Sequence, residues 1–188
     1  MRRASTWPEL DRLCRFVRAA DSLTDTLATW TGRGIEVQIV RRVDRVFPEP
    51  TLAERLDLHD DARVQEREVR IRCADVVLAE ARSWVAVDSP ALTPAARQSL
   101  RADGGLGDLL RPLNRRRSTL RVTACRTTPA HDPSVPVLLV QARLDVAGTP
   151  VAWCEETIYE AVLAGDGDGR RLTAARPRGH LVRPSIPA

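Results

Sequence analysis

An arginine stands on the apolar side of a predicted strand. Residues 65–73 have the alternating pattern of an extended chain, in which successive side chains point to opposite faces. Arg67 therefore shares its face with Val69, Ile71 and Cys73. A guanidinium on an apolar face needs a partner, because an isolated buried charge costs several kcal/mol. That partner is a protein carboxylate, water at the strand end or an anionic ligand, and the pattern leaves these three open.

A second arginine accompanies large apolar side chains on the next predicted strand, residues 77–87. Arg82 shares its face with Leu78, Glu80 and Trp84. This arrangement suits either a Glu80–Arg82 contact at the surface or the polar floor of a pocket.

Two adjacent glutamates occupy the last predicted strand, residues 151–159. Glu155 shares its face with Trp153, whereas Glu156 shares the opposite face with Cys154. Both faces are mainly apolar, so we expect at least one of the two carboxyl groups to be partly buried. A buried carboxyl group can act as a general acid near neutral pH. The alternative is an ion pair with an arginine of a neighbouring strand, and the pattern does not decide between them.

The composition excludes several kinds of site. All 29 basic residues are arginine, which rules out a Schiff-base lysine and the lysine of a phosphate-binding loop. The 4 cysteines are scattered and predict free thiols, and none of the 3 histidines lies beside a Ser or Cys nucleophile. We therefore expect no zinc site and no lysine-bound cofactor.

Charge and hydropathy limit the partners in the same way. Against 25 acidic residues the net charge is only +4, and the cluster Arg115-Arg116-Arg117 lacks neighbouring aromatic side chains. We expect this cluster to be a solvated loop and the protein to bind no nucleic acid. No apolar stretch is long enough to span a membrane, which predicts a cytoplasmic protein.

The elements that must position these residues are helices first and strands afterwards. This order predicts an α+β fold with a single, mainly antiparallel sheet of about six strands and helices packed on it. Residues 1–164 form the predicted domain, and the Gly-, Arg- and Pro-rich residues 165–188 a mostly disordered tail. The expected helices begin at Thr6, Ser22 and Thr93, and the expected strands cover residues 35–46, 64–74, 77–87, 120–126, 137–146 and 151–159.

Four short segments, in this order along residues 10–160, resemble the chorismate pyruvate-lyase family. The members of that family form 4-hydroxybenzoate and pyruvate from chorismate. The segments are Asp21-Ser22-Leu23-Thr24, Arg67-Glu68-Val69 with Ala81-Arg82-Ser83, Leu106-Gly107, and the turn Gly148-Thr149-Pro150 that leads to Glu155.

The resemblance implies a six-stranded sheet, a closed pocket and elimination of the enolpyruvyl group without a cofactor. It makes Arg67 the partner of the substrate's ring carboxylate and Arg82 that of the second carboxylate. Leu106 would touch the ligand through its backbone, and Leu23 would form an apolar wall. Glu155 would be the general acid at the ether oxygen.

Three alternatives accompany this interpretation. Glu156 follows Glu155 directly and leaves the choice of acid open by one residue. A ligand-sensing domain of the transcription-regulator kind has a similar fold, although such domains normally follow a winged DNA-binding region for which 188 residues leave no room. The third alternative is an enzyme of this fold acting on another substrate in secondary metabolism. In each case the expected partner is a small molecule, and the expected state a monomer or weak dimer.

Overall fold

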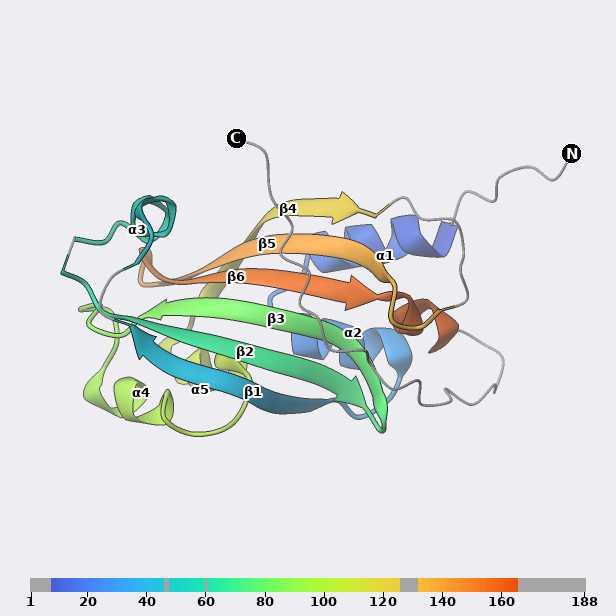
Figure 1. Ribbon diagram of the computed structural model, residues 1–188, viewed down its shortest axis with the longest axis horizontal. Helices are drawn as coiled ribbons and strands as arrows, with labels where there is room; N and C mark the ends of the chain where they lie inside the picture. Colours follow the sequence, from blue (N-terminus) through green and yellow to red (C-terminus); the bar gives the residue numbers. More distant parts are fainter. Residues whose placement is uncertain (1–7, 46–47, 60, 126–131, 166–188) are drawn as a thin grey trace, which may run out of the picture.

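A six-stranded antiparallel sheet forms the centre of the molecule (Figure 1). The computed structural model describes residues 8–45, 48–59, 61–125 and 132–165. In these residues the strand order is β1-β2-β3-β6-β5-β4, and every neighbouring pair is antiparallel. The strands are β1 (Glu36–Arg45), β2 (Val64–Cys73), β3 (Val76–Ala86), β4 (Arg116–Ala124), β5 (Pro136–Val146) and β6 (Thr149–Tyr159). The predicted fold class is confirmed.

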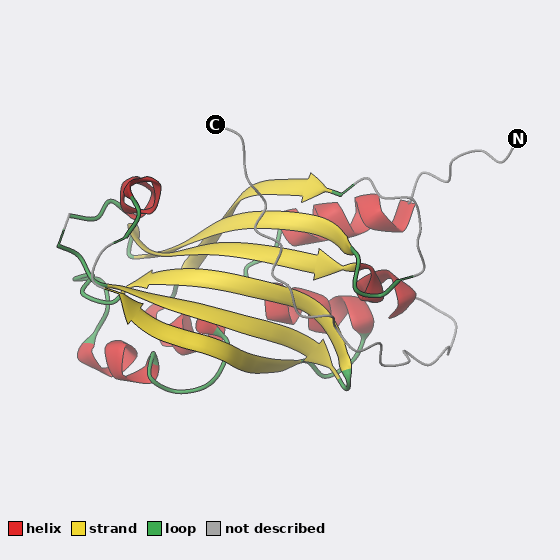
Figure 2. Ribbon diagram, viewed as in Figure 1, coloured by secondary structure: helices red, strands yellow, loops and turns green. Residues whose placement is uncertain are grey.

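The helices are divided between the two faces of the sheet (Figure 2). On the inner face, defined by Arg67, Ser83 and Cys154, lie α1 (Pro8–Arg18), α2 (Leu23–Thr31), α4 (Pro94–Ser99) and α5 (Leu106–Leu110). On the outer face, defined by Glu66, Trp84 and Trp153, lies α3 (Pro50–Leu56). Two short 3-10 turns complete the chain, η1 (Arg111–Leu113) after α5 and η2 (Glu160–Gly165) after β6.

Capping residues set the helix ends that the sequence predicts. The Ser22 hydroxyl accepts a hydrogen bond from the Asp25 amide at 3.3 Å, and α2 ends at Gly32 with φ of 65°. The Thr93 hydroxyl caps α4 in the same way, accepting from the Ala96 amide at 3.2 Å. Thr6, the predicted start of the first helix, lies outside the described residues.

Helix α3 is not among the helices expected from the sequence, which begin at Thr6, Ser22 and Thr93. Pro50 occupies the first turn of α3, where its missing N–H is no loss. Leu52 and Leu56, four residues apart, pack against Val64 and Trp153 on the outer face. Tertiary burial therefore stabilises a helix too short to form alone.

Strand β4 begins at Arg116, before the predicted start at residue 120. Its first residues pair with the far end of β5, so that Arg116 lies opposite Asp145 and Arg117 opposite Leu144. The expectation of a solvated loop for residues 115–117 is therefore wrong. The predicted tail, apart from Gly165, lies outside the described residues.

No helix in the described ranges is both long and apolar enough to cross a membrane.

Candidate ligand-binding site

The sheet separates the charged residues that the sequence placed in one pocket. Arg67 of β2 lies opposite Ser83 of β3, which directs the neighbouring Arg82 to the other face. Arg82 in turn lies opposite Glu155 of β6. Arg67 is therefore on the inner face, while Arg82 and Glu155 share the outer face. The structure does not bring the three together.

Arg67 is fully buried, with an exposed fraction of 0%. Its Nη1 donates to the Leu100 carbonyl at 2.7 Å and to Gln65 Oε1 at 3.2 Å, and its Nη2 donates to the Gly104 carbonyl at 3.0 Å. Its Nε is buried and has no hydrogen-bond partner within the described part of the chain. Among the same residues, no carboxylate lies within 4.0 Å of this guanidinium. The arginine thus retains a buried positive charge that the described residues do not neutralise.

The surroundings of Arg67 disfavour the charged form of its guanidinium. Burial is the main cause that lowers the pKa of the guanidinium, and the positive charge of Arg42 lowers it further, while Asp103 raises it in part. Arg42 is held near by a hydrogen bond to the Ala102 carbonyl at 3.1 Å. An anion bound beside Arg67 would favour the charged guanidinium and raise its pKa.

The inner face beside Arg67 is built from small side chains. One row across the sheet runs from Arg67 through Ser83 and Cys154 to Ala142. Leu106 of α5 packs over this row in the same apolar cluster as Cys154 and Ala142.

Leu23 lies at the start of α2 and is buried in the neighbouring apolar cluster. The Thr24 hydroxyl next to it would lie 3.9 Å from a Cβ built on Gly105. The beginnings of α2 and α5 are therefore adjacent, and the structure brings Leu23 and Leu106 to the same face as Arg67.

A buried ion pair occupies the β4 side of the inner face. Arg117 binds Glu156 with two hydrogen bonds, from Nη1 to Oε1 at 2.8 Å and from Nη2 to Oε2 at 2.7 Å. Burial alone would lower the pKa of Arg117, but the Glu156 carboxylate outweighs it and the pKa is raised. Glu156 thus forms the ion pair that the alternative predicted, but its arginine lies two strands away and not on a neighbouring strand. Its partner was missed because β4 and β6 are separated by β5 in the sheet.

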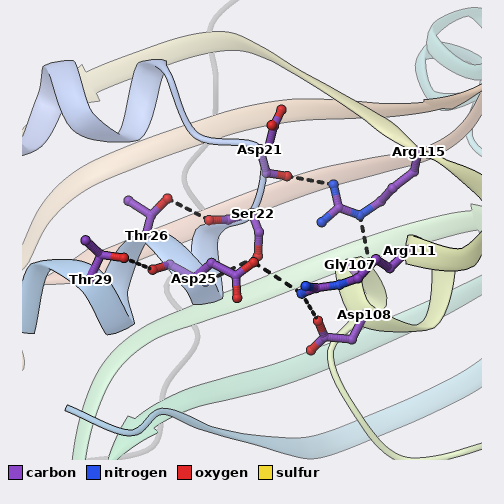
Figure 3. A network of polar contacts seen from close by, with 9 residues as sticks. All are labelled: Asp21, Ser22, Asp25, Thr26, Thr29, Gly107, Asp108, Arg111 and Arg115. Carbon is purple, nitrogen blue, oxygen red and sulfur yellow. Dashed lines mark hydrogen bonds and ion pairs between the residues drawn. The ribbon is translucent and has the colours of Figure 1, made fainter. Parts of the chain in front are cut away.

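Two arginines fasten α5 to the beginning of α2 (Figure 3). Arg115 donates from Nε to the Gly107 carbonyl at 2.8 Å and from Nη1 to the Asp21 carbonyl at 2.7 Å. Arg111 donates from Nη2 to Asp25 at 3.2 Å and to Asp108 at 2.5 Å. We call Arg111 and Arg115 the arginine clasp. It fixes the position of α5 over the inner face.

Gly107 allows Arg115 to approach the backbone closely. A Cβ at Gly107 would lie 3.0 Å from Arg115 Nη2, closer than ordinary van der Waals contact. The group that lies close to the Gly107 backbone is thus the Arg115 side chain.

The outer face holds the other predicted residues. Arg82 forms an ion pair with the buried Glu66, and its Nε donates to the same carboxylate. Glu155 keeps 36% of its side chain exposed and lies 3.7 Å from Arg55 of α3. The candidate general acid is therefore exposed on the face opposite Arg67.

Metal and disulfide chemistry find no support in the described residues. They contain no group of three or more His, Cys, Asp and Glu side chains that could hold a metal ion. All four cysteines are free, as the sequence predicts.

Comparison with known proteins identifies the fold. No family model matches the chain, and no curated protein matches its sequence. The effector domain of PhnF from Mycobacterium smegmatis matches with a TM-score of 0.56 and 14% identity, covering 75% of this chain and 90% of that one. The chain has the chorismate lyase-like fold of this effector domain. PhnF belongs to the GntR family of transcriptional regulators.

Two further structures agree. A longer PhnF chain from the same organism matches with a TM-score of 0.56 at 14% identity, and this chain covers 65% of it. The gene product SA0254 from Staphylococcus aureus matches with a TM-score of 0.50 at 12% identity, over 76% of this chain and 90% of that one.

These findings correct the predicted activity. The resemblance to the chorismate pyruvate-lyase family holds for the fold, but the assignment as a lyase is wrong. The matched PhnF structures belong to a transcriptional regulator and not to an enzyme. The geometry agrees, because a substrate carboxylate on Arg67 and an acid at Glu155 would lie on opposite faces of the sheet.

Proposed function

We propose that this chain is a cytoplasmic effector domain that binds a small anionic molecule and thereby controls a transcriptional regulator. The fold it shares with the PhnF effector domain supports the regulatory role. The buried charge of Arg67 supports the anionic ligand, and it is the observation that carries the proposal.

Arg67 has the properties expected of a ligand-binding arginine. Carbonyl oxygens and one amide oxygen fix its orientation without neutralising it. A planar guanidinium with an unused donor suits a carboxylate or a phosphate group. An anion at this position would offset part of the desolvation cost of the buried guanidinium.

The rest of the site would accommodate the body of the ligand. Ser83 offers a hydroxyl in register with Arg67, and Cys154 and Ala142 continue the same row with small side chains. Leu106 and Leu23 supply apolar walls from α5 and α2. A ligand with an acidic end and a small apolar or hydroxylated body fits this combination.

The arginine clasp would connect the site to the rest of a regulator. A ligand between Arg67 and Leu106 would contact α5, and the clasp joins α5 to α2. Binding would therefore change the stability of the α2–α5 contact. This gives the domain a way to report occupancy without catalysis.

A thermal-shift screen tests the proposal. The probes are inorganic phosphate, acetate, citrate and glucose 6-phosphate, each at equal ionic strength. We expect at least one of them to raise the melting temperature of the wild-type chain, to raise it equally in Arg82→Gln and to leave Arg67→Gln unchanged. A wild-type protein that no anion stabilises, or an Arg67→Gln variant that responds fully, would overturn the proposal.

A further inference from the structure

The outer face carries a cleft that the proposed effector site does not use. It has a volume of about 180 Å³ and lies between α3 and the outer face of β2, β3 and β6. Its lining residues are Pro48, Glu49, Thr51, Leu52, Arg55, Val64, Arg82, Trp84, Trp153 and Glu155. The sheet separates this cleft from Arg67.

Two arginines of the cleft lie over tryptophan rings. The Arg55 guanidinium carbon is 4.3 Å from the centre of the Trp153 ring, and that of Arg82 is 4.7 Å from the centre of the Trp84 ring. Trp84 and Trp153 are direct cross-strand partners in the β3–β6 register. The two arginine–tryptophan pairs therefore lie side by side on the outer face.

The guanidinium of Arg55 has donors to spare. Its contact with Glu155 is 3.7 Å long, which exceeds hydrogen-bond distance. Within the described residues it makes no hydrogen bond, although an arginine side chain has five N–H groups. Side-chain exposure of 38% leaves it accessible from the cleft.

Arg82 and Glu155 face each other across β3 and β6, but each is paired elsewhere. Arg82 binds the buried Glu66 of β2, and Glu155 accepts weak contacts from Gln141 and Trp153 at 3.4 Å. Both residues of this register pair line the cleft.

We propose that this cleft is a second ligand site, for a small planar organic acid such as an aromatic carboxylate. The carboxylate would bind the edge of the Arg55 guanidinium, where planar and bidentate recognition is possible. A flat ring would add a further layer to the Arg–Trp stacks, and Leu52 and Val64 would cover its edge. The ligand would be recognised by stacking as well as by charge.

Titration of the 15N-labelled full chain with sodium benzoate tests the proposal. The indole N–H signals of the tryptophans serve as probes, and single Trp→Phe variants assign them. We expect the Trp84 and Trp153 signals to shift saturably. The Trp30 signal serves as the internal reference, because its indole donates to the Val162 carbonyl at 3.2 Å away from the cleft. Cyclohexanecarboxylate, which has the same charge but no flat ring, should bind at least threefold more weakly.

Arg55→Gln and Arg67→Gln separate this site from the effector site. Arg55→Gln should weaken benzoate binding at least fivefold while its Trp30 signal stays in place, which shows that the variant is folded. Arg67→Gln should bind benzoate like the wild type. The proposal is overturned if benzoate causes no shift in the wild type, or if the shifts grow linearly with any sodium salt. It is also overturned if the shifts persist in Arg55→Gln. Loss of the shifts in Arg67→Gln alone also overturns it, and would assign benzoate to the effector site.

Discussion

Arg67 and Glu155 lie on opposite faces of one sheet. Arg67 pairs in register with Ser83, and Glu155 pairs with the next residue of the same strand, Arg82. Successive side chains of a strand point to opposite faces, so a shift of one residue in register decides which groups can meet a common ligand. An anion on the inner face meets a guanidinium without meeting this carboxyl group. Glu155 therefore does not lie where it could protonate a ligand held by Arg67.

The first prediction concerns catalysis. Incubation of the purified chain with chorismate should yield no 4-hydroxybenzoate and no pyruvate above the uncatalysed rate. Glu155 lies on the face opposite Arg67, and Glu156, on the same face, is held by both hydrogen bonds from Arg117. Chromatography and a coupled pyruvate assay measure the two products. Equimolar formation of both, abolished by Arg67→Gln, would restore the lyase assignment.

The second prediction concerns the Arg117–Glu156 pair. Both side chains are almost fully buried, at 4% and 5% exposure. Arg117→Met should lower the free energy of unfolding by about 3–5 kcal/mol, because it leaves a buried carboxylate without its partner. Urea denaturation measures the change, and Arg116→Met at the exposed neighbouring position should cost less than about 0.5 kcal/mol.

Removal of both charges tests the same explanation. The double variant Arg117→Met, Glu156→Leu should regain most of the lost stability, because apolar groups of similar volume can replace a buried ion pair. A double variant as unstable as Arg117→Met would show that packing, and not the unpaired charge, causes the loss.

The extent to which the sequence predicts the structure depends on the range of the interaction. Alternation along β2 correctly places Arg67 on the inner face, and Ser22 and Gly32 correctly mark the ends of α2. These are local signals. The acceptors of Arg67, in contrast, are carbonyl oxygens of residues 100 and 104, which reach β2 only after the chain has formed α4 and its following loop.

Two other features needed information that local patterns lack. The Arg117–Glu156 pair depends on the strand order, which places β5 between β4 and β6 and leaves long side chains to meet across it. Helix α3 depends on Trp153, a residue far along the chain that covers Leu52 and Leu56. The division of the predicted site between two faces follows from register, which hydrophobic alternation alone does not specify.

The third prediction concerns alkaline pH. Burial, aided by the Glu156 carboxylate, raises the pKa of the Cys154 thiol from 9.0 to about 12. Between these values the unfolded chain releases a proton that the folded chain keeps, so stability should fall as pH rises above 9, by about 1.4 kcal/mol per pH unit.

Tyr159 also lowers the stability of the folded chain as pH rises, at higher pH than Cys154. The cause is that burial and its hydrogen bond to Glu80 raise the pKa of the Tyr159 hydroxyl. Urea denaturation between pH 8.5 and about 10.5 should therefore give a shallower decline for Cys154→Ala than for the wild type. Equal slopes in the two proteins would contradict the assignment of the effect to this thiol.

The fourth prediction concerns the arginine clasp. Arg115→Ala removes two hydrogen bonds from a charged donor to backbone carbonyls, and each such bond contributes about 1.5–3 kcal/mol. The amides of Asp108 and Leu109, which donate to the Gly105 carbonyl, should exchange at least about tenfold faster with deuterium. Arg101→Ala, at an exposed position before α5, should leave these rates unchanged. Unchanged exchange in Arg115→Ala would mean that apolar packing alone holds α5 in place.

The buried charge of Arg67 is proposed to bind an anionic ligand. Calorimetric titration with the anion that most stabilises the wild-type chain measures this binding. We expect one binding event in the wild type, an equal one in Arg82→Gln, and at least a tenfold weaker one in Arg67→Gln. Equal affinity in the wild type and in Arg67→Gln would contradict this proposal.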